Sequence, residues 1–363
     1  MADTKSVSRK TKAVIDLSAL ISNYQYLASL APQSKTMAVI KANAYEHGAI
    51  EVAKALEPVV PAFAVAFVDE ALLLRNAGIT KTILVLEGPF KKSDFSTAIA
   101  HKLTLMLHTQ QHIDWLKNQE QYRHDTWIKV DTGMNRLGFH CDEVADVISQ
   151  LSPSQRKQLV LCTHFSTAEV PENPKTASQI AKLNQLIEQF SCQFSMANSA
   201  GILNWPASHG DFNRLGLALY GVSPIKPCAI VEPLIPVMTL QANIIAIHAI
   251  KAGETVGYGD TWQAKRPTTI AVIAIGYADG YPRNAKAGTP VYINGHIAPL
   301  AGRVSMDMIT IDITDISDVA VGDTVELWGK HVSVDTVAAY SDTINYELLT
   351  RLSARLPKTF VQS

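Results

Sequence analysis

Short apolar runs alternate with longer amphipathic stretches from about residue 35 to residue 221 of this 363-residue chain. Eight runs read as strands, at residues 37–40, 63–67, 82–86, 103–107, 127–130, 159–163, 194–197 and 215–220. The segments between them have helical features, such as the acidic start and glycine stop of 69–78 and the helical spacing of apolar residues in 176–190. Strands that alternate with helices pair in parallel, so the sequence predicts a (β/α)8 barrel.

The sequence changes character beyond residues 221–236, where prolines cluster. The later apolar segments are β-rich and are punctuated by glycine and proline, at 237–250, 268–275, 289–293, 308–313 and 324–328. We therefore expect a C-terminal, mainly β domain over residues 233–363, after a barrel over 12–232 and an N-terminal extension over 1–11. The chain is long enough for two domains with a core in each.

Composition excludes several classes of function. Lys and Arg number 32 against 33 Asp and Glu, and they form no basic stripe, so we expect no nucleic-acid partner. The polar N-terminus and the lack of a long apolar run predict a cytoplasmic protein without a membrane partner. The four cysteines are scattered and predict neither a disulfide framework nor a metal site: Cys141, Cys162, Cys192 and Cys228.

Lys41 directly follows the apolar run 36–40, where a buried strand is expected to open into a loop. Parallel α/β folds keep their chemistry at such strand ends. A lysine there can be desolvated, which lowers its pKa and makes it a candidate imine-forming nucleophile. Taken alone, a lysine that ends a strand is more often a satisfied or exposed cation.

Other cationic side chains are predicted at equivalent strand ends. Lys129 lies in the strand 127–130 and Arg136 in the loop after it, His164 follows the run 159–163, and Arg214 comes just before the run 215–220. Such converging charges need a ligand. The chain has no G-x-G-x-x-G turn and no Walker loop, so a nucleotide site has no support.

Nine motifs then make the chain resemble the alanine racemase family, from near residue 14 to the C-terminus. The first is Met37-Ala-Val-Ile-Lys-Ala-Asn-Ala-Tyr45, and the others occupy residues 131–138, 163–165, 198–200, 214–221, 256–259, 275–280, 302–307 and 344–347. The resemblance implies a racemase that interconverts L- and D-alanine with pyridoxal 5′-phosphate. In this family Lys41 holds the cofactor as an internal aldimine.

The resemblance also implies a two-base mechanism in a homodimer. Lys41 serves one face of the substrate Cα atom, and Tyr258 of the neighbouring subunit serves the other. His164 lies beside Tyr258, with Arg214 beyond it, and nearby cations make a tyrosine phenolate more accessible. Arg214 matches the arginine that faces the pyridine nitrogen and, because it keeps its proton, leaves that nitrogen unprotonated. This favours racemisation over transamination.

The same resemblance assigns the remaining site. Arg136 reaches the cofactor phenolic oxygen and the substrate carboxylate, Met306 of the partner offers its backbone N–H, and Lys129 matches a lysine that is often carbamylated. The phosphate is bound by Tyr45, Ser199, Tyr346 and the backbone of Gly216 and Leu217. Supporting positions are Tyr277 and Asp307, the latter in the motif 302–307. Tyr258 and Tyr346 form an inner gate that suits a methyl side chain, and the entrance is lined by Glu169, Tyr277, Arg283, Arg303 and Ile344.

Two positions depart from the family pattern. Glu46 stands where the family usually has glycine, which affects cofactor anchoring if the backbone there needs a positive φ. Ser305 stands where many members have cysteine.

Three alternative functions remain open at this point. A broad-spectrum or serine racemase shares fold and cofactor but has a wider pocket and is frequently exported. A related decarboxylase also joins a barrel to a β domain. A non-catalytic protein like the single-barrel pyridoxal phosphate homeostasis family would keep Lys41 but lack Tyr258 and the second domain. The sequence does not say whether D-alanine serves peptidoglycan synthesis, as we expect, or L-alanine serves catabolism.

Overall fold

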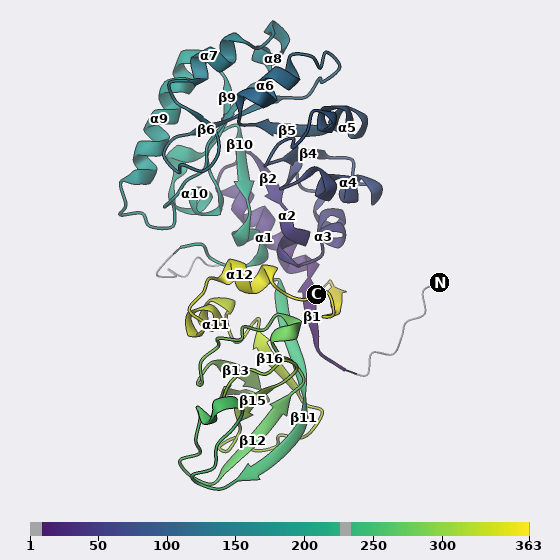
Figure 1. Cartoon of the computed structure of the whole chain (residues 1–363), viewed down its shortest axis with the longest axis vertical. Coiled ribbons are helices and arrows are strands. Elements are labelled where there is room, and N and C mark those ends of the chain that lie inside the picture. The colour runs from purple at the N-terminus through teal and green to yellow at the C-terminus, as the bar shows by residue number, and fades with distance from the viewer. Residues whose placement is uncertain (1–8, 226–233, 363) are drawn as a thin grey trace. The chain divides into compact units, whose positions relative to one another are not determined.

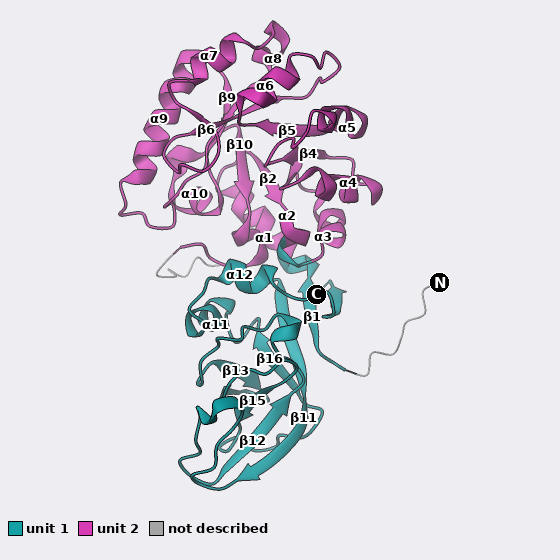
Figure 2. Cartoon of the chain, viewed as in Figure 1, with its two compact units in different colours: residues 1–19, 45–47, 235–363 teal, residues 20–44, 48–234 magenta. Residues whose placement is uncertain are grey.

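The computed structural model describes residues 9–225 and 234–362 (Figure 1). The chain forms two compact units (Figure 2). Residues 20–44 and 48–234 make up the barrel unit, and residues 1–19, 45–47 and 235–363 make up the β unit. The predicted domain ranges stay a prediction, because the boundary between residues 232 and 233 lies outside the described residues. Cys228 lies outside them too.

The barrel unit is built on eight parallel strands. Their order is β10, β2, β3, β4, β5, β6, β8 and β9, and the short β7 pairs with β6. The strands are β2 Lys35–Val39, β3 Ala62–Val65, β4 Thr82–Val85, β5 Leu103–Leu107, β6 Thr126–Asp131, β7 Phe139–His140, β8 Leu159–Cys162, β9 Gln193–Ser195 and β10 Phe212–Leu215. At the two ends of this path the Arg214 N–H donates to the Ala197 carbonyl over 2.9 Å, which nearly closes the barrel.

Helices follow the strands along the chain. They are α1 Leu17–Ser29, α2 Lys41–Tyr45, α3 Ala49–Leu56, α4 Val68–Asn76, α5 Ser93–His101, α6 Gln110–Leu116, α7 Val144–Ser149, α8 Pro153–Lys157, α9 Lys175–Phe190 and α10 Ser199–Asn204, with 3-10 turns η1 Pro206–Ser208 and η2 Leu217–Tyr220. Every residue of β3, β5 and β8 is buried, as expected for strands covered on both faces. In α9 the apolar residues Ile180, Leu183 and Leu186 are buried at helical spacing. The predicted barrel fold is confirmed.

The prediction of a strand at 215–220 is wrong. The eighth strand is β10, which ends at Leu215, and residues 217–220 form η2. Leu217 and Tyr220 are nonetheless 1% exposed, and the Tyr220 hydroxyl donates to the Val39 carbonyl over 3.0 Å. An apolar run of six residues signals burial, but it does not distinguish a strand from a short buried helix.

The β unit contains an eight-stranded sheet with the path β14, β13, β16, β11, β1, β17, and with β12 and β15 extending from β11. Its elements are β1 Lys12–Asp16, β11 Met238–Ile250, β12 Thr268–Ile273, β13 Pro290–Ile293, β14 His296–Pro299, β15 Ile309–Asp312, β16 Thr324–Trp328, β17 Lys358–Val361, α11 Val334–Tyr340, α12 Asn345–Thr350 and the 3-10 turns η3 Tyr258–Asp260 and η4 Tyr277–Asp279. The expected mainly β domain is confirmed. β1 pairs with β11 and β17 in this sheet, so the chain's first strand contributes to it.

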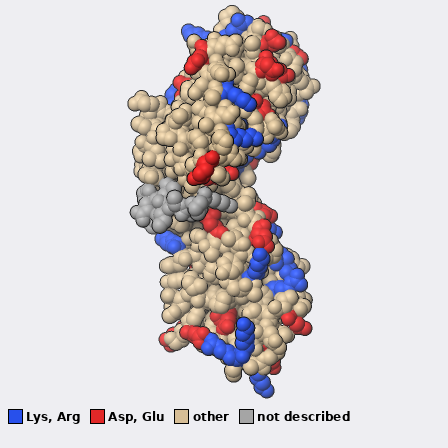
Figure 3. Space-filling model, turned by 90° about the vertical axis from the view of Figure 1, so that its left-hand side faces the viewer, with Lys and Arg blue, Asp and Glu red and all other residues tan. Residues whose placement is uncertain are grey.

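Charges of both signs are mixed on the face shown in Figure 3. Among the described residues, no helix is both long and apolar enough to cross a membrane. Within the same ranges, no group of three or more His, Cys, Asp or Glu side chains could hold a metal ion.

Candidate active site

Lys41 begins α2, which has a left-handed backbone and is not the open loop that the sequence suggested. β2 ends at Val39, and the next residues after Lys41 have positive φ in an unbroken series: Ala42 (51°), Asn43 (53°), Ala44 (54°), Tyr45 (52°) and Glu46 (61°). Each non-glycine residue in this conformation costs roughly 1–2 kcal/mol, and such residues usually occur singly. A series of five therefore persists only because the surrounding structure fixes it.

Four more cationic or imidazole side chains of the barrel unit converge with Lys41. Burial places the pKa of His164 well below its ordinary value, and positive charges lower it further: those of Lys129, Arg214, Arg136 and Lys41. His164 lies two residues beyond β8, and Lys129 lies within β6. The structure thus brings together the five residues that the sequence placed at separate strand ends.

Lys129 experiences the same environment. Burial lowers its pKa, and the charges of Arg214 and Arg136 lower it further, against opposing effects of Cys162 and Glu87. A lowered pKa raises the fraction of the neutral, nucleophilic amine. The cluster therefore concentrates positive charge where burial makes it costly, and such a site favours an anionic ligand.

Arg214 is anchored inside the barrel wall. It lies within β10, which corrects the prediction that it precedes a strand, and it is 4% exposed. Its Nη1 donates to the Ser195 carbonyl (3.0 Å) and Oγ (2.5 Å), and its Nη2 to the carbonyls of Thr163 (2.7 Å) and Met196 (3.2 Å). Nη2 also lies 3.5 Å from His164 Nδ1. Because guanidinium only donates, this contact suits a neutral histidine whose Nδ1 accepts.

Ser199 and Gly216 meet at a buried polar site of the barrel unit. Ser199 begins α10 and is 4% exposed, and its Oγ accepts from the N–H groups of Gly216 (3.0 Å) and Ala218 (3.3 Å). Asn198 caps the helix by accepting the Gly201 N–H over 2.9 Å. Leu217 follows Gly216 as the first residue of η2. A hydroxyl beside clustered backbone N–H groups matches what a phosphate requires.

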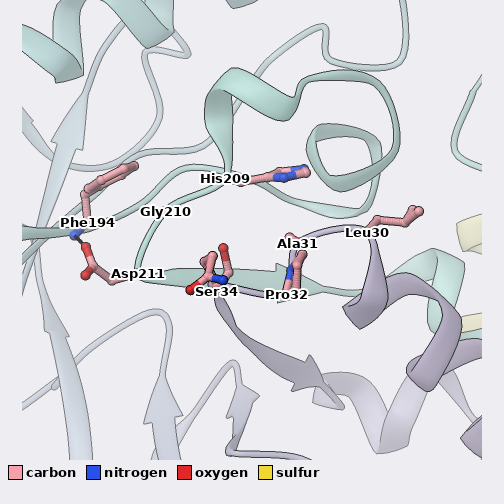
Figure 4. Close-up of a pocket in the computed structure, with 9 residues that line it drawn as sticks. Leu30, Ala31, Pro32, Ser34, Phe194, His209, Gly210 and Asp211 are labelled. Carbon is pink, nitrogen blue, oxygen red and sulfur yellow. Dashed lines mark hydrogen bonds between the residues drawn. The ribbon is translucent and has the colours of Figure 1, made fainter.

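Two cavities flank opposite ends of the strands. One of about 430 Å³ lies beside Arg136 and is also lined by His108, Asp131, Asn135 and His140. The other, of about 420 Å³, lies where β2, β9 and β10 begin and is lined by residues such as Ser34, Phe194, His209 and Asp211 (Figure 4). Chemistry in parallel barrels occurs at the carboxyl ends of the strands, so we assign the site to the end that carries Arg136.

The β unit holds the other predicted residues. The Tyr45 and Tyr346 rings lie 6.1 Å apart, and burial, followed by the effect of Tyr346, raises the pKa of Tyr45. Tyr258 is 67% exposed in η3, between Gly257 (φ 80°) and Gly259 (φ 75°). A side chain presented in this way is available to a ligand or a partner.

Hydrogen bonds within the β unit connect the segment that contains Met306 and Asp307 to the turn that contains Tyr277. Met306 is 54% exposed, and its carbonyl accepts the Ala278 N–H over 3.0 Å. Asp307 accepts from Arg355 Nη2 over 2.7 Å, and the Tyr277 N–H donates to the Ser305 carbonyl over 3.0 Å. The backbone of 305–307 is therefore tied to the turn that carries Tyr277.

Comparison with known proteins decides the family. The model of the alanine racemase N-terminal domain matches residues 15–224, and that of the C-terminal domain matches residues 237–360. The chain belongs to the alanine racemase family. An alanine racemase of Alteromonas mediterranea is 46% identical over 97% of this chain and 99% of its own length. This chain is therefore an alanine racemase, and its activity is the interconversion of the two enantiomers of alanine.

Solved racemase structures have the same fold. The biosynthetic alanine racemase of Pseudomonas aeruginosa superposes with a TM-score of 0.92 at 41% identity, covering 97% of this chain and 99% of that one. The alanine racemase of Bartonella henselae, solved with covalently bound pyridoxal phosphate, superposes with a TM-score of 0.88 at 33% identity, covering 97% and 99% of the two chains.

Two carboxylates of this racemase escaped the sequence analysis. Asp279 is 0% exposed and forms two hydrogen bonds with Arg9 (3.0 and 2.8 Å) and two with Arg355 (2.8 and 3.1 Å). Burial raises its pKa, but these bonds outweigh burial and hold the pKa below its ordinary value. The second is Glu70, in the first turn of α4. The motif 275–280 and the acidic start of 69–78 were the available signals, but neither indicates a bonding partner.

Proposed function

We propose that this racemase works with pyridoxal 5′-phosphate bound through Lys41. The observation that carries the proposal is the convergence of four cationic side chains on the buried His164: burial lowers the pKa of His164, and the charges of Lys129, Arg214, Arg136 and Lys41 lower it further. Such a buried cationic cluster suits a phosphorylated cofactor and an amino-acid carboxylate. The bound cofactor supplies an electron-withdrawing ring that makes the substrate Cα–H acidic.

The buried arginine sets the type of reaction. The guanidinium of Arg214 only donates hydrogen bonds and cannot accept one. If it faced the pyridine nitrogen of the bound cofactor, it would leave that nitrogen unprotonated and would limit how far the ring withdraws electrons. Its four hydrogen bonds to barrel carbonyls and to Ser195 Oγ support this fixed role. The consequence is return of the proton to Cα, which is racemisation.

Two bases move the proton at Cα. The Lys41 amine serves one face and the Tyr258 phenol the other, and Tyr258 comes from the partner subunit of a homodimer. The exposure of Tyr258 in the described chain supports this delivery. Arg136 binds the substrate carboxylate, with the Met306 N–H of the partner subunit as a second donor. Tyr258 and Tyr346 restrict the pocket to a methyl side chain.

Hydroxyl groups and backbone N–H groups would hold the phosphate of the cofactor. Ser199, Gly216 and Leu217 come from the barrel unit, and their bonding around Ser199 Oγ supports this assignment. The resemblance to the family assigns the hydroxyl groups of Tyr45 and Tyr346 to the same phosphate. Lys129, as a carbamate, orients Arg136, Tyr277 lines the entrance, and Asp307 is a supporting residue. The product D-alanine supplies peptidoglycan synthesis, and the expected cytoplasmic location stays a prediction.

Subunit complementation tests the shared site. Lys41→Ala and Tyr258→Phe proteins are purified separately, mixed, and dissociated and reassociated before circular dichroism of L-alanine is followed. A heterodimer then has one site with both residues intact and one with neither, so about a quarter of wild-type activity returns at equal mixing. If both bases of a site come from the same chain, one site of the heterodimer lacks Lys41 and the other lacks Tyr258, so mixing restores no activity.

A further inference from the structure

The residue that fixes the start of the left-handed segment is Glu70, on the neighbouring helix α4 (Val68–Asn76). Its Oε1 accepts the Ala42 N–H over 2.6 Å. This N–H belongs to the peptide bond that joins Lys41 to Ala42, so the hydrogen bond sets the orientation of the peptide plane directly after Lys41. The carboxylate thereby influences where the Lys41 side chain points.

The other oxygen of Glu70 binds a second loop. Oε2 accepts the N–H groups of Ala66 over 2.7 Å and Phe67 over 3.2 Å, at the end of β3. One carboxylate thus receives three backbone donors and joins the chain after β2 to the chain after β3. Because both oxygens accept, an ionised carboxylate satisfies all three donors and a neutral amide does not.

Residues 43 and 44 of the segment have further anchors in the barrel unit. The Ala44 N–H donates to the Ile40 carbonyl over 2.9 Å, and Asn43 accepts the N–H of Gly48 on its carbonyl (3.0 Å) and of Ala49 on its side chain (2.9 Å). The Glu70 bond acts on the peptide directly after Lys41. Strained backbone conformations persist where such contacts over-determine them.

We propose that Glu70 is a positioning residue that holds Lys41 in the orientation needed for cofactor attachment and proton transfer. The proposal rests on the assignment of Lys41 as the cofactor lysine. Glu70 itself touches neither the cofactor nor the substrate in this scheme. Its effect passes through the Lys41–Ala42 peptide.

The chain offers a matched control one helix further along. Asp94 lies in the first turn of α5 (Ser93–His101) and accepts the N–H groups of Phe90 (2.8 Å) and Lys91 (3.2 Å) on Oδ2. It ties its own preceding loop to a helix as Glu70 does. Its bonded partners lie in the loop after β4 and not in the segment that follows Lys41. Asp94→Asn therefore shows how the loss of a carboxylate–loop contact affects the protein when the segment after Lys41 is left intact.

The first measurement needs no cofactor. Hydrogen exchange of the apoprotein is followed by mass spectrometry over peptides that cover residues 41–48. In Glu70→Gln we expect exchange in this segment to accelerate about tenfold or more, because the carboxamide leaves at least one of the three donors without an acceptor. In Asp94→Asn the segment exchanges at the wild-type rate. Equal, wild-type exchange in both variants overturns the proposal.

The second measurement follows cofactor attachment. Apoprotein is mixed with pyridoxal 5′-phosphate, and the visible absorbance of the lysine-bound cofactor is recorded with time. We expect Glu70→Gln to slow attachment by roughly 10–100-fold and Glu70→Ala to slow it more, with Asp94→Asn near wild type. If Glu70→Gln shows altered exchange but attaches the cofactor at the wild-type rate, Glu70 orders residues 41–48 without positioning Lys41, and the proposal is overturned.

A Lys41→Ala apoprotein separates the two proposals. If it still attaches the cofactor at the wild-type rate, the assignment of Lys41 fails, whereas the hydrogen-exchange result continues to test the local role of Glu70. If attachment is lost in Lys41→Ala and slowed in Glu70→Gln, both assignments stand.

Discussion

Lys358 Nζ lies 2.7 Å from Glu46 Oε2, and Glu46 has a φ of 61° at the end of the left-handed segment. Both side chains are mostly buried, with exposures of 17% for Lys358 and 21% for Glu46. The ion pair ties the segment to β17 within the β unit. Glu46 thus has a backbone conformation that glycine usually adopts, and its ion pair with Lys358 stabilises the side chain in that conformation.

The ion pair and the backbone conformation have separable effects on stability. Glu46→Ala removes the ion pair but keeps a Cβ at positive φ, and we expect it to destabilise the protein by about 1 kcal/mol. Glu46→Gly also removes the ion pair, but glycine adopts this φ without strain, so it is more stable than Glu46→Ala by about 1 kcal/mol. Thermal unfolding of the three proteins measures the order.

Lys358→Met completes a double-mutant cycle for this pair. If the ion pair holds the segment, Lys358→Met destabilises the wild type more than it destabilises Glu46→Ala. Additive effects of the two substitutions would show that the charges do not interact in solution.

Removal of the cofactor lysine is the most direct test of the site. We expect Lys41→Ala to show no visible absorbance from covalently bound cofactor after incubation with pyridoxal 5′-phosphate and dialysis, because no other amine replaces it. Borohydride reduction followed by mass spectrometry identifies the modified residue in the wild type. Lys54→Ala, on the exposed face of α3, serves as the control and keeps the absorbance. Modification at a lysine other than 41 contradicts the assignment.

Tyr258→Phe removes one base and leaves the cofactor bound. A general base typically contributes about 10²–10⁴-fold, so we expect a loss of that size, larger in one direction of racemisation than in the other. Initial rates from L- and D-alanine in deuterated water separate the two directions. Tyr340→Phe, an exposed tyrosine of the same unit (39% exposed), is the control. Near-wild-type rates in both directions for Tyr258→Phe would exclude the two-base assignment.

The barrel could be predicted from sequence because its strands are buried on both faces. Continuous apolar runs such as Leu103–Leu107 then stand out between amphipathic helices. The errors lie where burial alone does not define the conformation. Residues 217–220 are apolar and buried, yet they form a 3-10 turn. β1 pairs with β11, some 225 residues away, and a local pattern carries no information on that partner.

The site residues were recognisable by motif, but their physical support was not. Lys129, Arg136, His164 and Arg214 were expected at one end of the barrel, and the structure brings them together. The left-handed series from Ala42 to Glu46 consists of alanine, asparagine, tyrosine and glutamate. It contains no glycine, the residue that would indicate positive φ in a sequence. It depends on tertiary hydrogen bonds such as that of Glu70, which a single sequence does not reveal.

His112 makes stability depend on pH. Burial, followed by the nearby charge of His108, lowers the pKa of His112 to about 4 from an ordinary value of 6.5. Because the folded pKa is depressed, the unfolded chain binds this proton first as pH falls. Stability is therefore full above about pH 6.5 and is lost between pH 6.5 and 4, by at most about 3 kcal/mol. His112→Gln should flatten the decline of the unfolding temperature in this window.

The comparison needs a histidine without this environment. His296 is exposed on β14, so His296→Gln should leave the wild-type pH dependence unchanged. If the unfolding temperature declines as steeply in His112→Gln as in the wild type, other groups cause the pH dependence. His164 is the first of these to examine, because its pKa is lowered as well.

The surroundings of Lys129 favour its neutral state. Because burial and the charges of Arg214 and Arg136 lower its pKa, its neutral amine is more populated than that of an exposed lysine. The neutral amine adds to carbon dioxide, forming a C–N bond and releasing one proton, and the carbamate anion then offsets the surrounding positive charge. We expect a carbamate carbon signal in 13C NMR after equilibration with 13C-bicarbonate, absent in Lys129→Met. Lys54→Met retains the signal, and a signal that survives in Lys129→Met contradicts the assignment.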